Sequence, residues 1–255
     1  IYKMDYSEML EEHKKKNASL TVGVIPVPMK EASRFGIMNT DQANRIIEFE
    51  EKPAEPKSNL ASMGIYIFNW ATLRRYLIED QAKAREMEDF GKNVIPTYLE
   101  NGENCFAFAF ECYWKDVGTI ESLWEANMEF LDPDHPLNIT EKEWRVYTSN
   151  RVAPPQFITE HATLRSSLID DGCYISGNVQ HSILSQNTKV GVNSLVKDSV
   201  IMSNVTIGEN CQVEYAIIGE NAVIPDGASV IGTRDNIAVI GYAEIVGGPK
   251  YDGEE

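Results

Sequence analysis

The chain has 255 residues, of which 43% are hydrophobic and 24% are charged, and its formal net charge is −16. This composition is ordinary for a globular protein with one large domain or two smaller ones. The acidic balance argues against nucleic acid and anionic membrane surfaces as partners, because both are bound by an excess of Lys and Arg. The longest apolar runs have the length of a strand, so we expect no membrane span, and the first residues lack the apolar core of a signal peptide.

The four cysteines are Cys105, Cys112, Cys173 and Cys211. No pair of them has CxxC spacing and no histidine cluster lies near them, so the spacing disfavours a zinc site. We expect reduced, mostly buried thiols in a cytoplasmic protein.

Helical and strand patterns alternate over the first 130 residues. Residues 6–17 place Tyr6, Met9 and Leu10 on one side of a helix, and residues 20–27 are a continuous apolar run typical of a buried strand. Further strands are expected at residues 45–53, 62–69 and 105–110, and further helices at residues 70–81, 89–102 and 119–131. Strands that alternate with helices predict an α/β sheet covered on both faces.

Two of these helices carry N-terminal signals. Asp89 precedes the pattern of residues 89–102 and is a candidate N-cap. At residues 119–131, spacing makes Thr119 a better N-cap than Asp116, with Ser122 where a capping box normally has an acid. Capping is therefore the weaker explanation for Asp116.

A repeat follows a connector at residues 131–160, in which DPDHP and APP disfavour helix. From about residue 164 to 232, an aliphatic side chain recurs roughly every six positions, and a small side chain follows many of them four residues later. The aliphatic positions are Ile169, Ile175, Ile183, Val190, Val196, Ile201, Ile207, Val213, Ile218 and Ile224. The small ones are Cys173, Val179, Ser194, Val205, Cys211, Ala222 and Ala228.

A longer period of 17 residues relates SILS at 182–185, SVIM at 199–202 and AIIG at 216–219. Three short strands per coil, each pointing an aliphatic side chain inward, make a triangular solenoid. The pattern looks like the hexapeptide left-handed parallel β-helix, whereas a β-sandwich does not explain the period. Some acyltransferases also use this solenoid with a catalytic histidine, but we expect neither His161 nor His181 to be catalytic, because no coenzyme A feature accompanies them.

Several strand ends in the first half carry residues suited to a ligand. Glu51 and Lys52 end one strand, where a Glu accepts from sugar hydroxyls and a Lys neutralises a phosphate. Gly36 would let the backbone approach a ligand, and Ser62 would donate to a sugar. A solvated strand end or a turn explains each of them equally well when it is taken alone.

YWKDVGT, residues 113–119, gives the sharpest signal. Its carboxylate, Asp116, comes at a predicted strand end and is followed by Val-Gly. A carboxylate in that place is well suited to bind Mg²⁺ through oxygen.

FGIM, EFEEKP, LASMGIYIF, DFGKNVIP and YWKDVGT occur in this order and precede the hexapeptide repeats. With this arrangement the chain resembles, over essentially its whole length, bacterial glucose-1-phosphate adenylyltransferase (ADP-glucose pyrophosphorylase). The resemblance implies the C-terminal part of an α/β, incomplete Rossmann-like nucleotidyltransferase domain at residues 1–130, the connector at 131–160, and a left-handed parallel β-helix at 161–255. It also implies the reaction, in which a phosphate oxygen of glucose 1-phosphate attacks the α-phosphorus of ATP to give ADP-glucose and pyrophosphate for glycogen synthesis.

The resemblance assigns roles residue by residue. It makes Asp116 a Mg²⁺ ligand and, together with Lys52, a catalytic residue. Contacts with glucose 1-phosphate are implied for Gly36, Glu51, Lys52, Ser62, Tyr66, Asp89, Phe90 and Trp114.

One part of the family pattern is missing from the printed residues. The family begins with a Gly-rich loop, GGxGxRL, that holds nucleotide phosphates through backbone N–H groups, and it carries a second catalytic Asp in a GDH tripeptide directly before IYKMDY. Neither is present, and Asp5 is not a substitute, because the family has an Asp at that place as well. We therefore interpret the chain as the C-terminal part of such an enzyme, expect it to be inactive alone, and expect Asp116 to be half of the metal site.

The resemblance leaves two alternatives within the superfamily. One is a non-catalytic regulatory subunit, which is disfavoured because the EKP and YWKDVGT motifs are intact. The other is a nucleotidyltransferase for a different sugar, such as mannose or N-acetylglucosamine. The resemblance further implies a homotetramer, or a hetero-oligomer with a regulatory subunit, and allosteric control whose sites we do not place.

Overall fold

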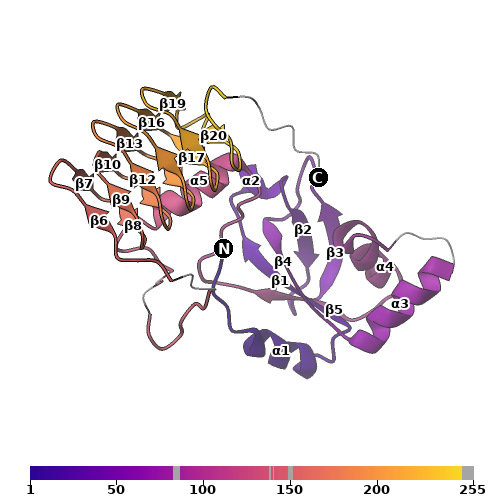
Figure 1. Ribbon diagram of the computed structural model, residues 1–255. Coiled ribbons are helices and arrows are strands. Elements are labelled where there is room, and N and C mark those ends of the chain that lie inside the picture. The colour runs from indigo at the N-terminus through magenta and orange to yellow at the C-terminus, as the bar shows by residue number, and fades with distance from the viewer. Residues whose placement is uncertain (83–86, 138, 140, 149–151, 249–255) are drawn as a thin grey trace. The chain divides into compact units, whose positions relative to one another are not determined.

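The computed structural model describes residues 1–82, 87–137, 139, 141–148 and 152–248 (Figure 1). The chain divides into two compact units. One unit is Tyr2–Trp114, and the other contains Ile1 and the chain from Lys115 onward. The boundary therefore lies inside YWKDVGT.

The first unit is built on a five-stranded sheet with the strand order β3-β2-β4-β1-β5 (Figure 1). Its strands are β1 (Leu20–Pro26), β2 (Gly36–Thr40), β3 (Ile46–Glu51), β4 (Leu60–Phe68) and β5 (Cys105–Ala109). Its helices are α1 (Tyr6–Lys15), α2 (Met29–Ala32), α3 (Trp70–Ala82), the π-helix η1 (Phe90–Val94) and α4 (Ile95–Glu100). Only β1 and β5 pair in parallel; the other pairs are antiparallel, so the sheet is mixed.

Helices cover both faces of this sheet, as the sequence predicts. Leu20, Val22 and Val24 of β1 enter a core that contains residues of α3, η1 and α4. Ile25 points to the opposite face, where it packs in a second core with Met9 of α1. The alternation along β1 explains why a strand that is apolar throughout is buried on two sides.

Asp89 caps a helix, but the helix begins with a π-turn. Its carboxylate accepts a hydrogen bond from the Lys92 backbone N–H at 2.8 Å. Pro96, in the first turn of α4, has no N–H to donate to the Lys92 carbonyl, so a regular α-helical hydrogen-bond pattern does not run through this segment. The sequence pattern predicted the helix and its cap correctly and did not predict the wide turn.

The second unit contains a solenoid of three parallel sheets, each with five short strands (Figure 1). The first sheet is β6 (Phe157–Ile158), β9 (Tyr174–Ile175), β12 (Lys189–Val190), β15 (Thr206–Ile207) and β18 (Val223–Ile224). The second is β7 (Thr163–Arg165), β10 (Asn178–Gln180), β13 (Leu195–Lys197), β16 (Gln212–Glu214) and β19 (Ser229–Ile231). The third is β8 (Leu168–Ile169), β11 (Ile183–Leu184), β14 (Val200–Ile201), β17 (Ala216–Ile218) and β20 (Ala238–Ile240).

The 17-residue period is the register of these sheets. Ile183, Val200 and Ile217 are successive neighbours in the third sheet. Corner asparagines follow the same step, because Asn187 donates to Asn204, which donates to Asn221, each 17 residues further on. These asparagines have positive φ, a conformation that Asn tolerates better than most residues, which explains their recurrence between the aliphatic positions.

One coil is shorter than the period, and this shifts the interior positions. Strands β9 and β10 are separated only by Ser176 and Gly177. A Cβ at Gly177 would lie 2.5 Å from the Ser194 carbonyl oxygen, so this tight corner requires glycine. As a result Val179, predicted to be a small corner residue, is an interior strand residue.

The same shift corrects the expectation for Ile183. The interior residue of β11 is Leu184, which is 1% exposed and lies in the solenoid core. Ile183 points outward and packs in a separate cluster with Trp124 and Met128. A regular spacing of six residues does not account for the two-residue shortening. It therefore selects Ile183 instead of Leu184 as the interior residue.

The outward apolar positions of the third sheet are covered by α5 (Ile120–Glu129). Trp124 and Met128 of this helix pack with Val200 and Ile217, and Trp124 Nε1 donates to the Asp198 carbonyl oxygen at 2.8 Å. Thr119 is the N-cap, as predicted. The Ser122 hydroxyl closes the capping box by accepting from the Thr119 N–H at 3.1 Å, so a hydroxyl takes the place of the usual acid.

The cysteines are free, and three of them, Cys105, Cys173 and Cys211, are buried, whereas Cys112 is exposed. Within the described ranges, no helix combines the length and apolarity needed to cross a membrane.

Candidate active site

The site begins where β3 ends beside the start of β2. Antiparallel pairing places Gly36, the first residue of β2, directly opposite Glu51, the last residue of β3. Gly36 is thus a strand residue rather than a turn glycine. The pairing brings FGIM and EFEEKP together, although 14 residues separate the two positions along the chain.

The turn of DFGK lies against the same carboxylate. A Cβ at Gly91 would lie 2.7 Å from Glu51 Oε2 and 3.3 Å from Asp89 Oδ1. Asp89 is exposed and is held by its cap to Lys92 N and by its own N–H, which donates to Asn93 Oδ1 at 3.1 Å. Two exposed carboxylates, Glu51 and Asp89, therefore both lie close to the Cβ position of Gly91.

Tyr66 of β4 connects these carboxylates to Ser62. Its hydroxyl is 3.4 Å from Ser62 Oγ. Burial is the largest cause of the raised pKa of Tyr66. The Ser62 hydrogen bond opposes it, and the Glu51 and Asp89 carboxylates add smaller contributions that raise the pKa. The phenol is therefore neutral at physiological pH and can donate a hydrogen bond.

Phe90 forms an aromatic wall with two residues of β4. Its ring centroid lies 5.4 Å from that of Tyr66 and 5.2 Å from that of Phe68. These rings line a pocket of about 460 Å³, whose full lining is Tyr2, Tyr6, Gly64, Ile65, Tyr66, Ile67, Phe68 and Phe90. The sequence analysis did not select Phe68, although it lies two residues after Tyr66 and hence on the same face of the strand.

Lys52 follows Glu51 in a strained conformation. Its φ is +48°, and its N–H donates to the Phe35 carbonyl oxygen at 3.1 Å. This left-handed conformation costs a non-glycine residue roughly 1–2 kcal/mol. Among the residues that the structure describes, none forms a hydrogen bond or ion pair with the Lys52 ammonium, whereas the nearby Lys57 is bound to Glu48 at 2.6 Å. Strain that is kept at an exposed cation is typical of functional positions.

Trp114 packs against other residues of the first unit. Its ring packs edge-on against Phe35 with centroids 5.6 Å apart, and its backbone forms a bridge with Tyr2. Through Phe35, Trp114 is linked to the segment whose carbonyl holds Lys52. Trp114 is not among the residues of the pocket lining given above, and of the predicted sugar contacts only Tyr66 and Phe90 are.

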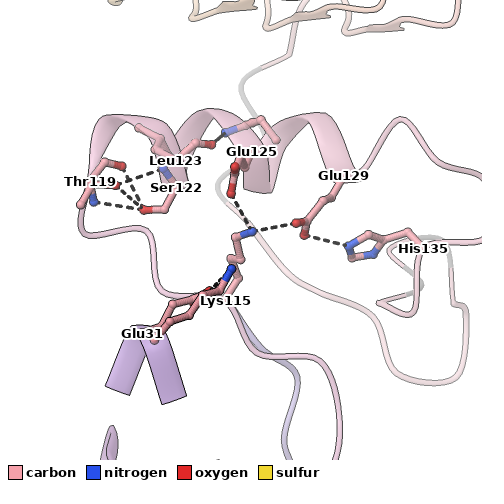
Figure 2. Close-up of polar contacts among 10 residues, drawn as sticks. Glu31, Lys115, Thr119, Ser122, Leu123, Glu125, Glu129 and His135 are labelled. Atoms are coloured by element: carbon pink, nitrogen blue, oxygen red, sulfur yellow. Dashed lines mark hydrogen bonds and ion pairs between the residues drawn. The ribbon is translucent and has the colours of Figure 1, made fainter. Parts of the chain in front are cut away.

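Asp116 belongs to the second unit. It is half-buried, and its carboxylate lies over Gly118, where a Cβ would be only 3.1 Å from Oδ2. Its neighbour Lys115 anchors α5 by binding Glu125 Oε2 at 3.2 Å and Glu129 Oε1 at 2.8 Å (Figure 2). Burial opposes the charge of Lys115, but the two glutamates outweigh it and raise its pKa. The charge of Lys115 is therefore used within its own unit.

The carboxylate oxygens of Asp116 are of the type that binds Mg²⁺. In the described part of the chain, no three acidic, histidine or cysteine side chains gather as a metal site. Mg²⁺ is commonly held by one or two carboxylates together with substrate phosphates and water, so a single carboxylate fits as one ligand of such a site.

Comparison with protein families gives two matches. Residues 1–133 match the family described as nucleotidyl transferase. Residues 153–237 match the family described as GlmU-like, C-terminal hexapeptide. The second match identifies the coils as hexapeptide repeats, which confirms the left-handed parallel β-helix predicted from the sequence.

Proposed function

Because the chain belongs to the nucleotidyl transferase family and carries hexapeptide repeats, which together indicate a sugar-1-phosphate nucleotidyltransferase, we propose that its sugar substrate is glucose 1-phosphate and its nucleotide is ATP. The observation that carries the proposal is the convergence of Glu51, Asp89 and Tyr66 beside an unpaired cation. The products are ADP-glucose and pyrophosphate, and the proposed role is glycogen synthesis in the cytoplasm.

The polar groups of the site suit a sugar. Glu51 and Asp89 present carboxylate oxygens that accept from hydroxyls. The Tyr66 and Ser62 hydroxyls share one hydrogen bond, and the hydroxyl that accepts in it keeps its own hydrogen for a ligand. Phe90 and Phe68 add an apolar surface for the face of the ring. A few placed polar groups beside aromatic side chains are the usual composition of a small-molecule site.

Lys52 suits the phosphate of that sugar. Its ammonium has no partner among the described side chains, so its charge is available to an anionic ligand. In the proposed reaction a phosphate oxygen of the sugar forms a bond to the α-phosphorus of ATP, and the bond from that phosphorus to the pyrophosphate oxygen breaks. Lys52 would lower the repulsion between the two phosphates, and Glu51 would hold the sugar in the orientation for attack. Mg²⁺, for which Asp116 would provide one carboxylate oxygen, supplies further neutralisation of phosphate charge when bound.

The test is a comparison of two lysines. Lys52→Ala should weaken binding of glucose 1-phosphate by roughly 10- to 100-fold, as expected for a lost charged hydrogen bond, and should leave unphosphorylated glucose unchanged. The matched control is Lys57→Ala, which removes a lysine already bound to Glu48 and should change neither ligand. Titration calorimetry of the 255-residue chain measures both.

Two results would count against the proposal. The first is equal weakening of glucose 1-phosphate and ATP by Lys52→Ala in an enzyme that carries the family's Gly-rich loop, since the proposal assigns Lys52 to the sugar phosphate. The second is a thermal shift of such an enzyme with UDP-glucose that exceeds its shift with ADP-glucose, since this would point to another nucleotide.

We further propose, from the resemblance alone, that the enzyme works as a homotetramer or with a regulatory subunit and is under allosteric control. Light scattering coupled to size exclusion measures the first property. A monomer at micromolar concentration would contradict the homotetramer.

A further inference from the structure

The carboxylate of Glu51 lies between two glycines that come from different elements. Gly36 begins β2, and Gly91 lies in the π-helix η1. A Cβ at Gly36 would be 2.9 Å from Glu51 Oε2, and a Cβ at Gly91 would be 2.7 Å from the same oxygen. Both distances are shorter than real Cβ contacts, so a Cβ at either position would displace the carboxylate, which is the flexible end of an exposed side chain.

Backbone conformation does not explain these glycines. Neither Gly36 nor Gly91 has the positive φ that would favour glycine for its freedom, in contrast to Gly64 and Gly102 of the same unit. Alanine is therefore compatible with the backbone at both positions. What the two positions share is that an added Cβ would meet Glu51 Oε2.

The two glycines are not equivalent as probes. A Cβ at Gly36 would also come within 2.7 Å of two atoms of the Phe49 ring, which packs against the sheet core. The atoms nearest to a Cβ at Gly91 belong to Glu51 and, at the easier distance of 3.3 Å, to Asp89 (Oδ1). Gly91 therefore reports on the carboxylates with little disturbance of the core.

We propose that Gly91 is a positioning residue: because it has no side chain, the Glu51 carboxylate can lie where it does beside Asp89, and this place determines which sugar hydroxyls the site accepts. The inference rests on the proposed function, since it assigns a specificity to the same sugar site. The structure supplies the reason: Glu51 Oε2 occupies the space that a Cβ at position 91 would need, and no hydrogen bond from the described residues would hold the exposed carboxylate there against such a Cβ.

The consequence is a selectivity that can be measured. A carboxylate in this place accepts hydrogen bonds from hydroxyls at particular positions of the sugar ring. A substrate that lacks one of these hydroxyls leaves the charged acceptor without one of its donors. Such a loss costs roughly 10- to 100-fold in affinity. A carboxylate displaced by an alanine methyl group at position 91 meets the hydroxyls elsewhere or not at all, and this penalty disappears.

The first experiment compares Gly91→Ala with Gly23→Ala. Position 23 is the matched control, because a Cβ there would make only ordinary contacts, 3.5 Å from Ile65 Cβ, within the same sheet. Affinities for glucose 1-phosphate and its 2-, 3-, 4- and 6-deoxy analogues are measured on the 255-residue chain. We expect at least one deoxy analogue to bind wild type and Gly23→Ala roughly 10-fold or more weaker than the parent sugar, and to bind Gly91→Ala with nearly parental affinity. A merely structural loss would weaken all five sugars by the same factor, and that result would overturn the inference.

The second experiment removes the clash from the other side. Glu51→Asp shortens the side chain by one methylene group, so Gly91→Ala should destabilise the wild-type background more than the Glu51→Asp background in chemical denaturation. If the effects of Gly91→Ala and Glu51→Asp on the free energy of unfolding are additive, the inference is overturned regardless of the ligand affinities. Additivity would mean that a side chain at position 91 does not meet Glu51.

The two measurements separate this inference from the proposed function. If the wild-type chain binds no sugar phosphate but the two positions are coupled in stability, the proposed substrate is wrong and the positioning of Glu51 stands. If the wild type binds glucose 1-phosphate and Gly91→Ala does not change the affinities of the deoxy analogues relative to the parent sugar, the proposed substrate stands and the inference fails.

Discussion

The two units of this chain treat their polar side chains in opposite ways. In the solenoid, polar groups pair with one another from coil to coil, as in the Asn187–Asn204–Asn221 series and the contact of His181 Nδ1 with Asp198 Oδ1 at 2.7 Å. At the end of β3, Glu51 and Lys52 have no hydrogen-bond partner among the described side chains. Repeated, satisfied pairs stabilise a scaffold, whereas unsatisfied exposed charges are left for a ligand. The difference favours the sheet unit as the place of the proposed sugar site, whereas Asp116, the proposed Mg²⁺ ligand, belongs to the second unit.

The largest expected effect tests the interior register of the solenoid. Leu184→Ala should lower the free energy of unfolding by roughly 2–5 kcal/mol, because it opens a cavity in a core where this side chain is fully enclosed. Leu168→Ala is the matched control in the same sheet, since Leu168 is 41% exposed and points outward, and it should cost less than about 1 kcal/mol. Denaturant unfolding measures both, and equal costs would refute the inward assignment of Leu184.

The next effect tests whether the internal polar pairs of the solenoid stabilise it. Ser199 is fully buried, and its hydroxyl accepts from the Ala216 N–H at 3.1 Å and donates to the Lys197 carbonyl oxygen at 2.7 Å. Ser199→Ala leaves a buried N–H without its acceptor and should cost roughly 1–3 kcal/mol. Ser229→Ala, at an exposed position of β19, should be nearly neutral in the same melting or denaturant series. A neutral Ser199→Ala would mean that the paired groups contribute nothing to the scaffold.

A third prediction concerns an ionisable group in the sheet core. Burial, with a smaller contribution from Glu103, raises the pKa of the Cys105 thiol to about 12. Because the folded pKa lies above the unfolded one, the neutral thiol contributes stability fully below about pH 8.5 and loses it as the pH rises toward 12. Urea unfolding between pH 8 and 11 should show a steeper loss for wild type than for Cys105→Ala. The exposed Cys112, replaced in the same way, controls for loss of a sulfur atom. Parallel curves for wild type and Cys105→Ala would contradict the prediction.

The smallest expected effect compares a buried hydroxyl without a hydrogen-bond partner, that of Tyr98, with the hydrogen-bonded hydroxyl of Ser199. Tyr98 is fully buried in the sheet core, and its hydroxyl has no hydrogen-bond partner among the described residues. Tyr98→Phe should therefore change the free energy of unfolding by less than about 1 kcal/mol, and in the stabilising direction, because it removes an unsatisfied polar group. Thermal unfolding beside Ser199→Ala compares one satisfied and one unsatisfied hydroxyl. A large loss in Tyr98→Phe would show that the hydroxyl is bonded.

Sequence patterns predicted the local elements well. Strands β1, β3, β4 and β5, the longer helices, the caps at Asp89 and Thr119, and the 17-residue repeat follow from side-chain periodicity and capping chemistry, which act within a few residues. Strand β2 and the short helix α2 were not predicted. The prediction failed at Ile183, where a two-residue shortening of one coil moved the interior position to Leu184. A regular pattern contains no signal for such a shortening until strand pairing reveals it.

The candidate site likewise contains residues that the sequence analysis selected and one that it did not. Motif order along the chain was sufficient to select Gly36, Glu51, Tyr66 and Asp89, and the structure brings these four close together. Gly91 was not selected, since nothing in DFGK by itself distinguishes a glycine needed for backbone freedom from one needed for space.

The amino-acid sequence by itself therefore determined the two kinds of fold, their order and the residues that carry charge at strand ends, because periodicity, propensity and capping are local properties. Only the tertiary structure decided which charges remain unpaired and what holds them in place. Those outcomes depend on antiparallel pairing of β2 with β3 and on the approach of η1, which bring together atoms that are far apart along the chain. The space that Gly36 and Gly91 leave for the Glu51 carboxylate is the clearest result of that approach.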